Sequence, residues 1–124
     1  MNEATPGSDR RRLATLSAAV VALSLIFFID LCGALFACGC RSLWAGASAL
    51  CNVHAATPPH CPWCAHPATV GAVAFLAITA AQVAAIFLPR GLTLPSRVLL
   101  AAAAMPVVGG AVGWLQGWLF GYWA

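Results

Sequence analysis

The chain contains three long stretches in which apolar residues follow one another almost without interruption. They run from Leu13 to Ala37, from Ala68 to Leu88 and from Val98 to Trp123. A helix needs roughly 20 apolar residues to cross the hydrocarbon core of a bilayer, and each stretch reaches that length. A helix also satisfies every backbone N–H and C=O within the segment, as lipid requires. The pattern therefore predicts an all-α integral membrane protein with three transmembrane helices, over 13–37, 68–88 and 98–123.

The segments between these stretches complete the predicted organisation. Residues 1–12 are polar and are expected to form a disordered cytoplasmic tail. Residues 89–97 are expected to form a short turn between the second and third helices. Residues 38–67 form a longer loop that is rich in cysteine and histidine. This loop is the only part of the chain with distinctive chemistry.

The composition supports a membrane protein and excludes several function classes. Hydrophobic residues make up 62% of the chain and charged residues only 7%, with no lysine, whereas soluble domains carry about 25% charged residues. No basic stripe with interleaved aromatic residues indicates nucleic-acid binding. The sequence also lacks a Ser-His-Asp set, paired carboxylates and a glycine-rich phosphate loop, so a hydrolase or kinase is not expected.

The distribution of arginine predicts the orientation. Arg10, Arg11 and Arg12 precede the first predicted span, and Arg90 and Arg97 flank the turn between the second and third. The Cys/His-rich loop contains a single arginine, at position 41. Because short cytoplasmic segments carry the excess of arginine, the N-terminus is expected in the cytoplasm and the 38–67 loop outside the cell (inner) membrane. Tyr122 and Trp123 would then lie at the outer interface.

A cleaved signal is an alternative interpretation of the first stretch. The arginines, the apolar run and the sequence Leu35-Phe36-Ala37-Cys38 resemble a lipoprotein-type signal. The run is longer than the roughly 7–15 apolar residues of a signal, and Asp30 interrupts its end, so we favour an uncleaved helix. Cleavage would leave two spans and a lipid anchor on Cys38.

The third stretch carries glycines at every fourth position. They are Gly109, Gly113, Gly117 and Gly121. Small residues with this spacing let helix backbones approach closely in lipid, as in a glycine zipper. The ridge predicts tight packing against another span or association with another chain, as a homo- or hetero-oligomer.

Few polar or reactive side chains lie inside the predicted spans. Asp30 is near the outer end of the first span, where it is expected to reach interfacial water; the alternative is a proton or cation site. Cys32 is expected to be a small buried hydrophobe, or else an additional ligand for an ion that descends from the loop. Gln82 and Gln116 are expected to form hydrogen bonds between helices.

All cysteines and histidines of the chain fall between residues 32 and 66. In order they are Cys32, Cys38, Cys40, Cys51, His54, His60, Cys61, Cys64 and His66. Thiolate and imidazole select soft or borderline ions such as zinc and copper(I) over calcium or magnesium. This clustering is the strongest functional signal in the sequence.

The spacing of these residues predicts a metal site. Cys51 and His54 form a C-x-x-H pair, and Cys61 and Cys64 form a C-x-x-C pair. Two such pairs complete a tetrahedral site, so these four are the favoured ligands for zinc or copper(I). An alternative or second set of ligands is Cys38 and Cys40, with His60 and His66 as further candidates. The protein would then be a metal transport or hand-off accessory, or a metal-stabilised subunit.

Two other interpretations of the loop stay open. Cys61-Pro62-Trp63-Cys64 is also the pattern of a redox dithiol, which would make the chain a membrane thiol-disulfide oxidoreductase. Alternatively, the six cysteines form disulfides in an oxidising compartment. The loop would then be a stapled docking surface of a larger membrane complex.

Overall fold

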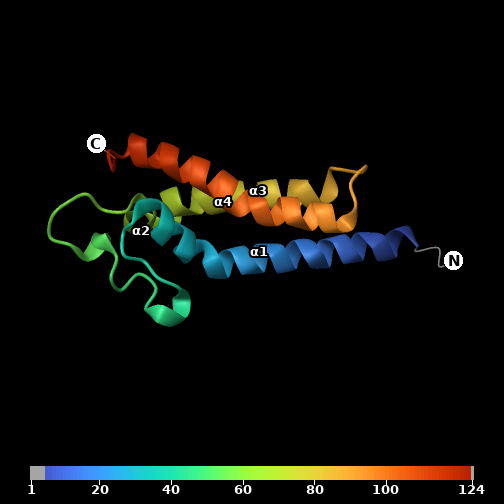
Figure 1. The fold of residues 1–124 in the computed structure, drawn as a ribbon, viewed down its shortest axis with the longest axis horizontal. Helices are drawn as coiled ribbons and strands as arrows, with labels where there is room; N and C mark the ends of the chain where they lie inside the picture. The colour runs from blue at the N-terminus through green and yellow to red at the C-terminus, as the bar shows by residue number, and fades with distance from the viewer. Residues whose placement is uncertain (1–4, 124) are drawn as a thin grey trace.

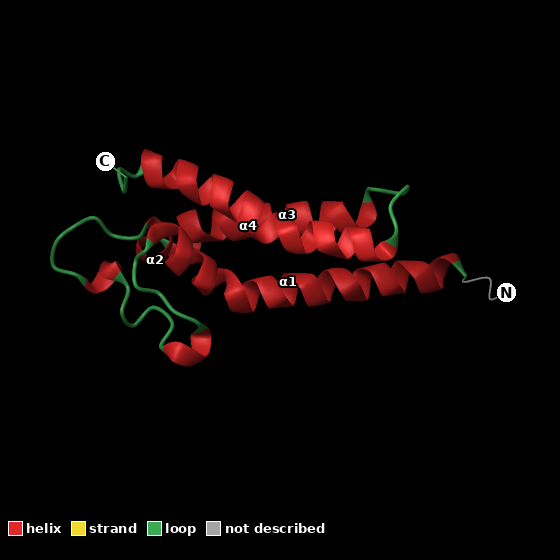
Figure 2. Cartoon of the chain, viewed as in Figure 1, coloured by secondary structure: helices red, strands yellow, loops and turns green. Residues whose placement is uncertain are grey.

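The computed structural model describes residues 5–123, and within them the chain consists of helices joined by loops, without a β-strand. The elements are α1 (Pro6–Phe36), η1 (Leu43–Ala45), η2 (Asn52–His54), α2 (Pro62–Ala65), η3 (Pro67–Gly71), α3 (Ala72–Phe87) and α4 (Leu94–Leu119). Three helical segments are long and apolar enough to cross a membrane, namely α1, η3 together with α3, and α4. They lie side by side along the long axis of the molecule (Figures 1 and 2). The all-helical prediction is confirmed for the described residues.

The first helix begins earlier than the apolar pattern predicts. Pro6 occupies its first turn, where a missing N–H costs nothing and the fixed φ of proline already suits a helix. Residues 6–12 are therefore helical, and the prediction of a disordered tail is wrong for them. Residues 1–4 of that predicted tail lie outside the described residues. The prediction rested on the polarity of the segment, and polarity by itself does not exclude a helix.

The fourth helix is shifted toward the N-terminus relative to the predicted span 98–123. It starts after Thr93 and carries Pro95 in its first turn, where proline is tolerated. It ends at Leu119, because Gly121 adopts a φ of +69° and the Tyr122 N–H donates back to the Gly117 carbonyl at 2.7 Å. The predicted turn 89–97 is correspondingly shorter, and Gly121 is not part of the helical ridge.

The three long helices pack as one bundle. The most extensive contact is between α3 and α4, and α1 lies against both. The Gln82 Nε2 group donates to Ser24 Oγ at 2.6 Å and to the Ala101 carbonyl at 3.1 Å, so one buried side chain joins all three helices. This agrees with the interhelical hydrogen bonding predicted for Gln82.

Three glycines of the predicted ridge are buried within this chain. A Cβ atom on Gly109 would lie 2.9 Å from Ile78 Cδ1, and one on Gly113 would lie 2.8 Å from Trp63 Cζ2. The corresponding space at Gly117 is filled by the Trp123 indole. The glycines thus allow α4 to approach other parts of the same molecule. Association with another chain through this ridge stays a prediction.

The loop folds against one end of the bundle. Residues 37–66 lie at the end opposite the N-terminus, together with the C-terminal residues (Figure 1). The ring of Phe36 contacts Tyr122 and Trp123 there, with centroid separations of 5.2 and 5.6 Å. Tyr122 and Trp123 are half-buried against the end of α1. The Cys/His-rich loop and the ends of α1, α3 and α4 therefore form one packed unit.

Candidate metal centre

The six cysteines come from separate segments that converge at this end of the bundle. Cys32 lies in the last turns of α1, and Cys38 and Cys40 follow that helix directly. Cys51 immediately precedes η2, Cys61 immediately precedes α2, and Cys64 lies within α2. Together with aromatic and aliphatic neighbours they form one buried cluster. The loop therefore folds around its own sulfur atoms.

The end of α1 turns the chain so that its cysteines face inward. Ala37 ends the helix in the left-handed region at φ 48°, and Gly39 follows at φ 92°. A Cβ atom on Gly39 would also collide with the Leu50 carbonyl oxygen. Only glycine combines this φ with so close an approach. Cys38 and Cys40, on either side of Gly39, are both buried.

A single helical turn presents the next two cysteines. Pro62 starts α2, and Cys61 and Cys64 are three residues apart, which places them on the same side of the turn. Trp63, between them, stacks on Phe28 with a centroid separation of 4.6 Å. Its indole N–H donates to Gln116 Oε1 at 2.7 Å. Trp63 therefore fixes this turn to α1 and α4.

Asn52 links the remaining segments of the loop. Its backbone N–H donates to the Cys38 carbonyl at 2.7 Å, and its side-chain oxygen accepts from the Cys61 N–H at 2.7 Å. Its side-chain nitrogen donates to the Tyr122 hydroxyl at 2.9 Å, which in turn donates to the Phe36 carbonyl. One residue thus spans the segments that carry Cys38, Cys51 and Cys61.

The sulfur atoms lie within the spacing that a bound metal ion requires. Cys32 Sγ is 3.2 Å from Cys61 Sγ and 3.8 Å from Cys64 Sγ, and Cys40 Sγ is 3.4 Å from Cys64 Sγ. Four groups of three sulfurs have all mutual distances within 4.8 Å. These groups are Cys32–Cys38–Cys61, Cys32–Cys40–Cys64, Cys38–Cys40–Cys51 and Cys51–Cys61–Cys64. The cluster can bind a metal by this geometry.

Burial and mutual hydrogen bonding set the protonation of these thiols. Five cysteines are at most 8% exposed, and only Cys64 is half-buried. Burial raises the pKa values of Cys38 and Cys40, because a thiolate loses hydration there. Hydrogen bonding from the Cys32 and Cys64 thiols lowers the pKa of Cys61 to about 3.

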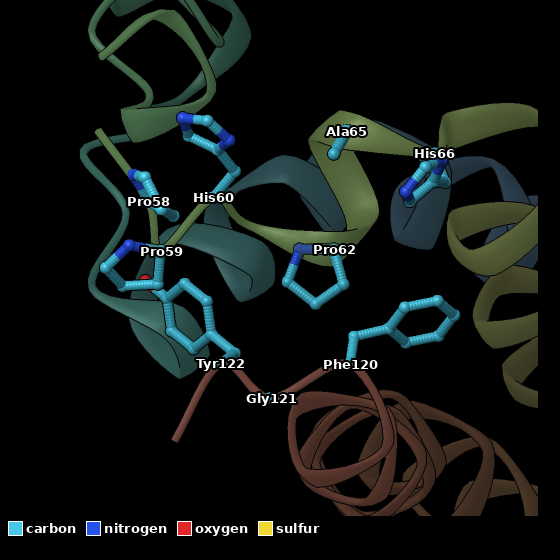
Figure 3. A pocket seen from close by; sticks show the side chains of 9 residues that line it. All are labelled: Pro58, Pro59, His60, Pro62, Ala65, His66, Phe120, Gly121 and Tyr122. Carbon is cyan, nitrogen blue, oxygen red and sulfur yellow. The ribbon is translucent and has the colours of Figure 1, made fainter. Parts of the chain in front are cut away.

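The histidines do not take part in these groups. Within residues 5–123, every group of three metal-ligating side chains at this spacing consists of cysteines. The ring nitrogen Nε2 of His54 lies 3.1 Å from the Ser48 carbonyl oxygen, and that of His60 lies 3.0 Å from the Ala55 carbonyl oxygen. His66 packs toward Phe120. His60 and His66 are far apart on the wall of a separate pocket and do not converge (Figure 3).

Sequence reasoning identified part of the cysteine cluster. Of the favoured set, Cys51, Cys61 and Cys64 come together, but His54 does not join them. Cys32, expected to be mainly a buried hydrophobe, belongs to two of the four groups. The available sign that Cys32 joins the cluster was its position one helical turn before Phe36, on the face of α1 that is buried. Asn52 and Trp63 were missed as positioning residues because their contacts are distant in sequence.

The thiol geometry also bears on the two alternative interpretations. All six cysteines are free, so no disulfide staples the loop. Cys61, the thiol with the low pKa, is 0% exposed, whereas Cys64 of the same C-x-x-C pair is half-buried. An exchange dithiol therefore stays an alternative interpretation of this pair.

A pocket opens beside the cluster. It has a volume of about 330 Å³, and its lining includes Cys32, Cys64, Ser48 and His54. Cys64, the only cysteine that is not fully buried, therefore borders this opening. The pocket gives small solutes a route to the sulfurs.

Comparison of the chain with known protein families, with curated proteins and with solved structures finds no significant match.

Proposed function

We propose that this chain is a small integral membrane protein that binds a soft metal, zinc or copper(I), through its cysteine cluster and passes it on at the membrane surface. The observation that carries this proposal is the convergence of six free thiols from separate segments. Thiolates select soft ions, and closely spaced buried thiolates are stable only when a cation compensates their charge.

The outer surface of the helices supports insertion into a bilayer. Many large apolar side chains on the long helices face outward rather than into the bundle, among them Leu25, Leu76, Leu99, Leu115 and Leu119. A soluble monomer rarely exposes an apolar surface of this extent. In a membrane these side chains contact lipid, which removes the free-energy cost of exposing them to water.

The positions of the arginines support a cluster on the extracytoplasmic side. Arg10 to Arg12 lie in the first turns of α1, and Arg90 and Arg97 border the connection between α3 and α4. Both regions are at the end of the bundle opposite the cysteines (Figure 1). The arginine excess marks the cytoplasmic side, so the metal centre faces outward.

The pocket favours hand-off over a purely structural role. A structural metal site is closed, whereas Cys64 is half-buried and borders an opening. An acceptor molecule can approach the metal through this sulfur. The cluster then releases its ion without unfolding of the loop.

Metal retention by the purified protein tests the proposal. The reduced protein in detergent, loaded anaerobically with zinc or copper(I) and passed over a desalting column, is expected to retain metal in a fixed ratio to chain. Cys61→Ser is expected to lose most of that metal, and His54→Ala, His60→Ala and His66→Ala together are expected to keep it. A folded, reduced chain that retains no metal would contradict the proposal.

The exchange route has its own test. Ser48→Trp places a large side chain on the pocket wall and is expected to slow transfer of bound metal to a water-soluble chelator at least several-fold, without changing the amount bound. Ala49→Trp is the matched control, because Ala49 is exposed and does not line the pocket. Equal transfer rates in both variants would argue for a structural metal instead.

A further inference from the structure

The four groups of three sulfurs share their cysteines in a regular pattern. Each of the six cysteines belongs to two groups, and each therefore neighbours four of the other five sulfurs. The pairs that share no group are Cys32 with Cys51, Cys38 with Cys64, and Cys40 with Cys61. Six points with four neighbours and one opposite point each are the corners of an octahedron. The four groups are alternate faces of that octahedron.

We propose that this octahedron of sulfurs holds a cluster of four copper(I) ions. The inference rests on the metal-binding function proposed above and specifies its metal and stoichiometry. One ion occupies each of the four groups and is bound by three thiolates. Each thiolate bridges two ions, because each cysteine belongs to two groups. All six sulfurs are then used equally.

The distances suit this arrangement. Metal–thiolate bonds are about 2.3 Å long, so three sulfurs in a plane around one ion lie about 4.0 Å apart. The closest sulfur pairs in the cluster are 3.2 to 3.8 Å apart, and all pairs within a group are within 4.8 Å. Small side-chain rotations bring the closer pairs to the required spacing.

Charge and coordination number favour copper(I) over zinc for the complete set. One tetrahedral zinc ion uses four thiolates and leaves two cysteines without a role. One zinc ion with four thiolates and four copper(I) ions with six thiolates each carry a net charge of −2. The copper cluster therefore uses all six cysteines without adding uncompensated charge, which is expensive in a buried site. Each bound thiol releases its proton to water, and copper stays in the +1 state throughout.

Apolar side chains cover most of such a cluster. Five of the ligands are nearly inaccessible, and Phe28, Leu31, Leu35 and Val53 pack around them. Cys32 and Cys64 both line the pocket, and Cys64 is the half-buried one, so the ions that Cys64 binds exchange first. Burial of the other ligands limits the access of oxygen and so protects copper(I) and its thiolates from oxidation.

An anaerobic titration of the reduced protein in detergent with copper(I)–acetonitrile tests the inference. We expect four copper ions per chain after competition with a copper(I) chelator, orange-red luminescence under ultraviolet light and a short copper–copper distance in X-ray absorption. Saturation at one or two ions without that distance would overturn the cluster but leave the proposed metal-binding function intact. Failure of the reduced, helical protein to retain any metal would overturn both.

Cysteine variants provide a second readout. Cys51→Ser removes one bridging sulfur and opens two of the four copper sites, so the retained copper is expected to fall from four ions to two or fewer, with loss of luminescence. The triple variant His54→Ala, His60→Ala and His66→Ala is the matched control and is expected to retain four. Four luminescent copper ions in Cys51→Ser, or their loss in the histidine variant, would contradict the cluster. Circular dichroism of each variant verifies that the helices are formed.

Discussion

Asn52 connects three segments around the cysteine cluster through its hydrogen bonds. Its backbone and side chain bond to the Cys38 carbonyl, the Cys61 N–H and the Tyr122 hydroxyl. These bonds fix three chain segments that are distant in sequence. Because metal affinity depends on how well the ligands are positioned beforehand, Asn52 is a positioning residue.

Replacement of Asn52 tests this role. Asn52→Ala leaves the Cys61 N–H without its partner, and an unsatisfied buried donor costs about 1–3 kcal/mol. We expect the metal affinity to fall by about 10-fold, since 1.4 kcal/mol corresponds to that factor. Tyr122→Phe removes one bond of Asn52 and the bond from the Tyr122 hydroxyl to the Phe36 carbonyl, but leaves the Cys61 N–H paired, so it is expected to have a smaller effect. Chelator competition measures both, and unchanged affinity in Asn52→Ala would show that the loop is positioned by other contacts.

Gly33 shows how closely the loop approaches α1. A Cβ atom at this position would collide with the backbone carbonyl oxygen of Cys40. A backbone atom cannot move aside as a flexible side chain can, so alanine here would displace the segment that carries Cys38 and Cys40. The glycine is therefore required by the ligand geometry rather than by helix formation, which glycine disfavours.

At the scale of elements, the short helix α2 depends on the long helices for its position. A helix of four residues is not stable alone. Trp63 anchors it by stacking on Phe28 and by donating to Gln116 Oε1, while Gln116 Nε2 donates to the Val70 carbonyl at 3.1 Å. The bundle thus places Cys61 and Cys64 through one indole and one amide.

Two buried glutamines allow a matched test of how the bundle positions α2. Gln116→Leu leaves the buried Trp63 N–H unsatisfied, and Gln82→Leu removes the bonds to Ser24 and Ala101. Each is expected to lower the unfolding free energy by about 1–2 kcal/mol. Only Gln116→Leu is expected to weaken metal binding as well, because Gln82 does not contact the loop. Denaturant unfolding and chelator competition measure the two effects, and equal loss of affinity in both variants would point to general destabilisation.

At the scale of the whole molecule, the two ends of the bundle differ in chemistry. One end carries five of the six arginines, and the other carries every cysteine and histidine. In a membrane with the proposed orientation, the metal centre lies on the extracytoplasmic side. Short connections carrying arginine stay in the cytoplasm.

Reporter fusions test the orientation. Alkaline phosphatase, which folds only after export, is expected to be active when fused after Ala124 and inactive when fused after Gly91. A fluorescent protein that folds only in the cytoplasm is expected to give the reverse pattern. The opposite result at both positions would place the cysteine cluster in the cytoplasm and remove the extracytoplasmic hand-off.

The sequence by itself determined the class of fold and the location of the chemistry. Three long apolar runs predict helices, because backbone groups in lipid have no other partner. The confinement of Cys and His to 32–66 marked the functional region without any structure. These properties are local, so a linear pattern reveals them.

Only the tertiary structure decided which of these side chains meet. Cys32 joins the cluster because the chain reverses at Ala37 and Gly39, and the histidines stay apart because the same folding directs their rings toward loop carbonyls or Phe120. Convergence of ligands depends on contacts between residues far apart in the chain, which spacing along the sequence does not encode.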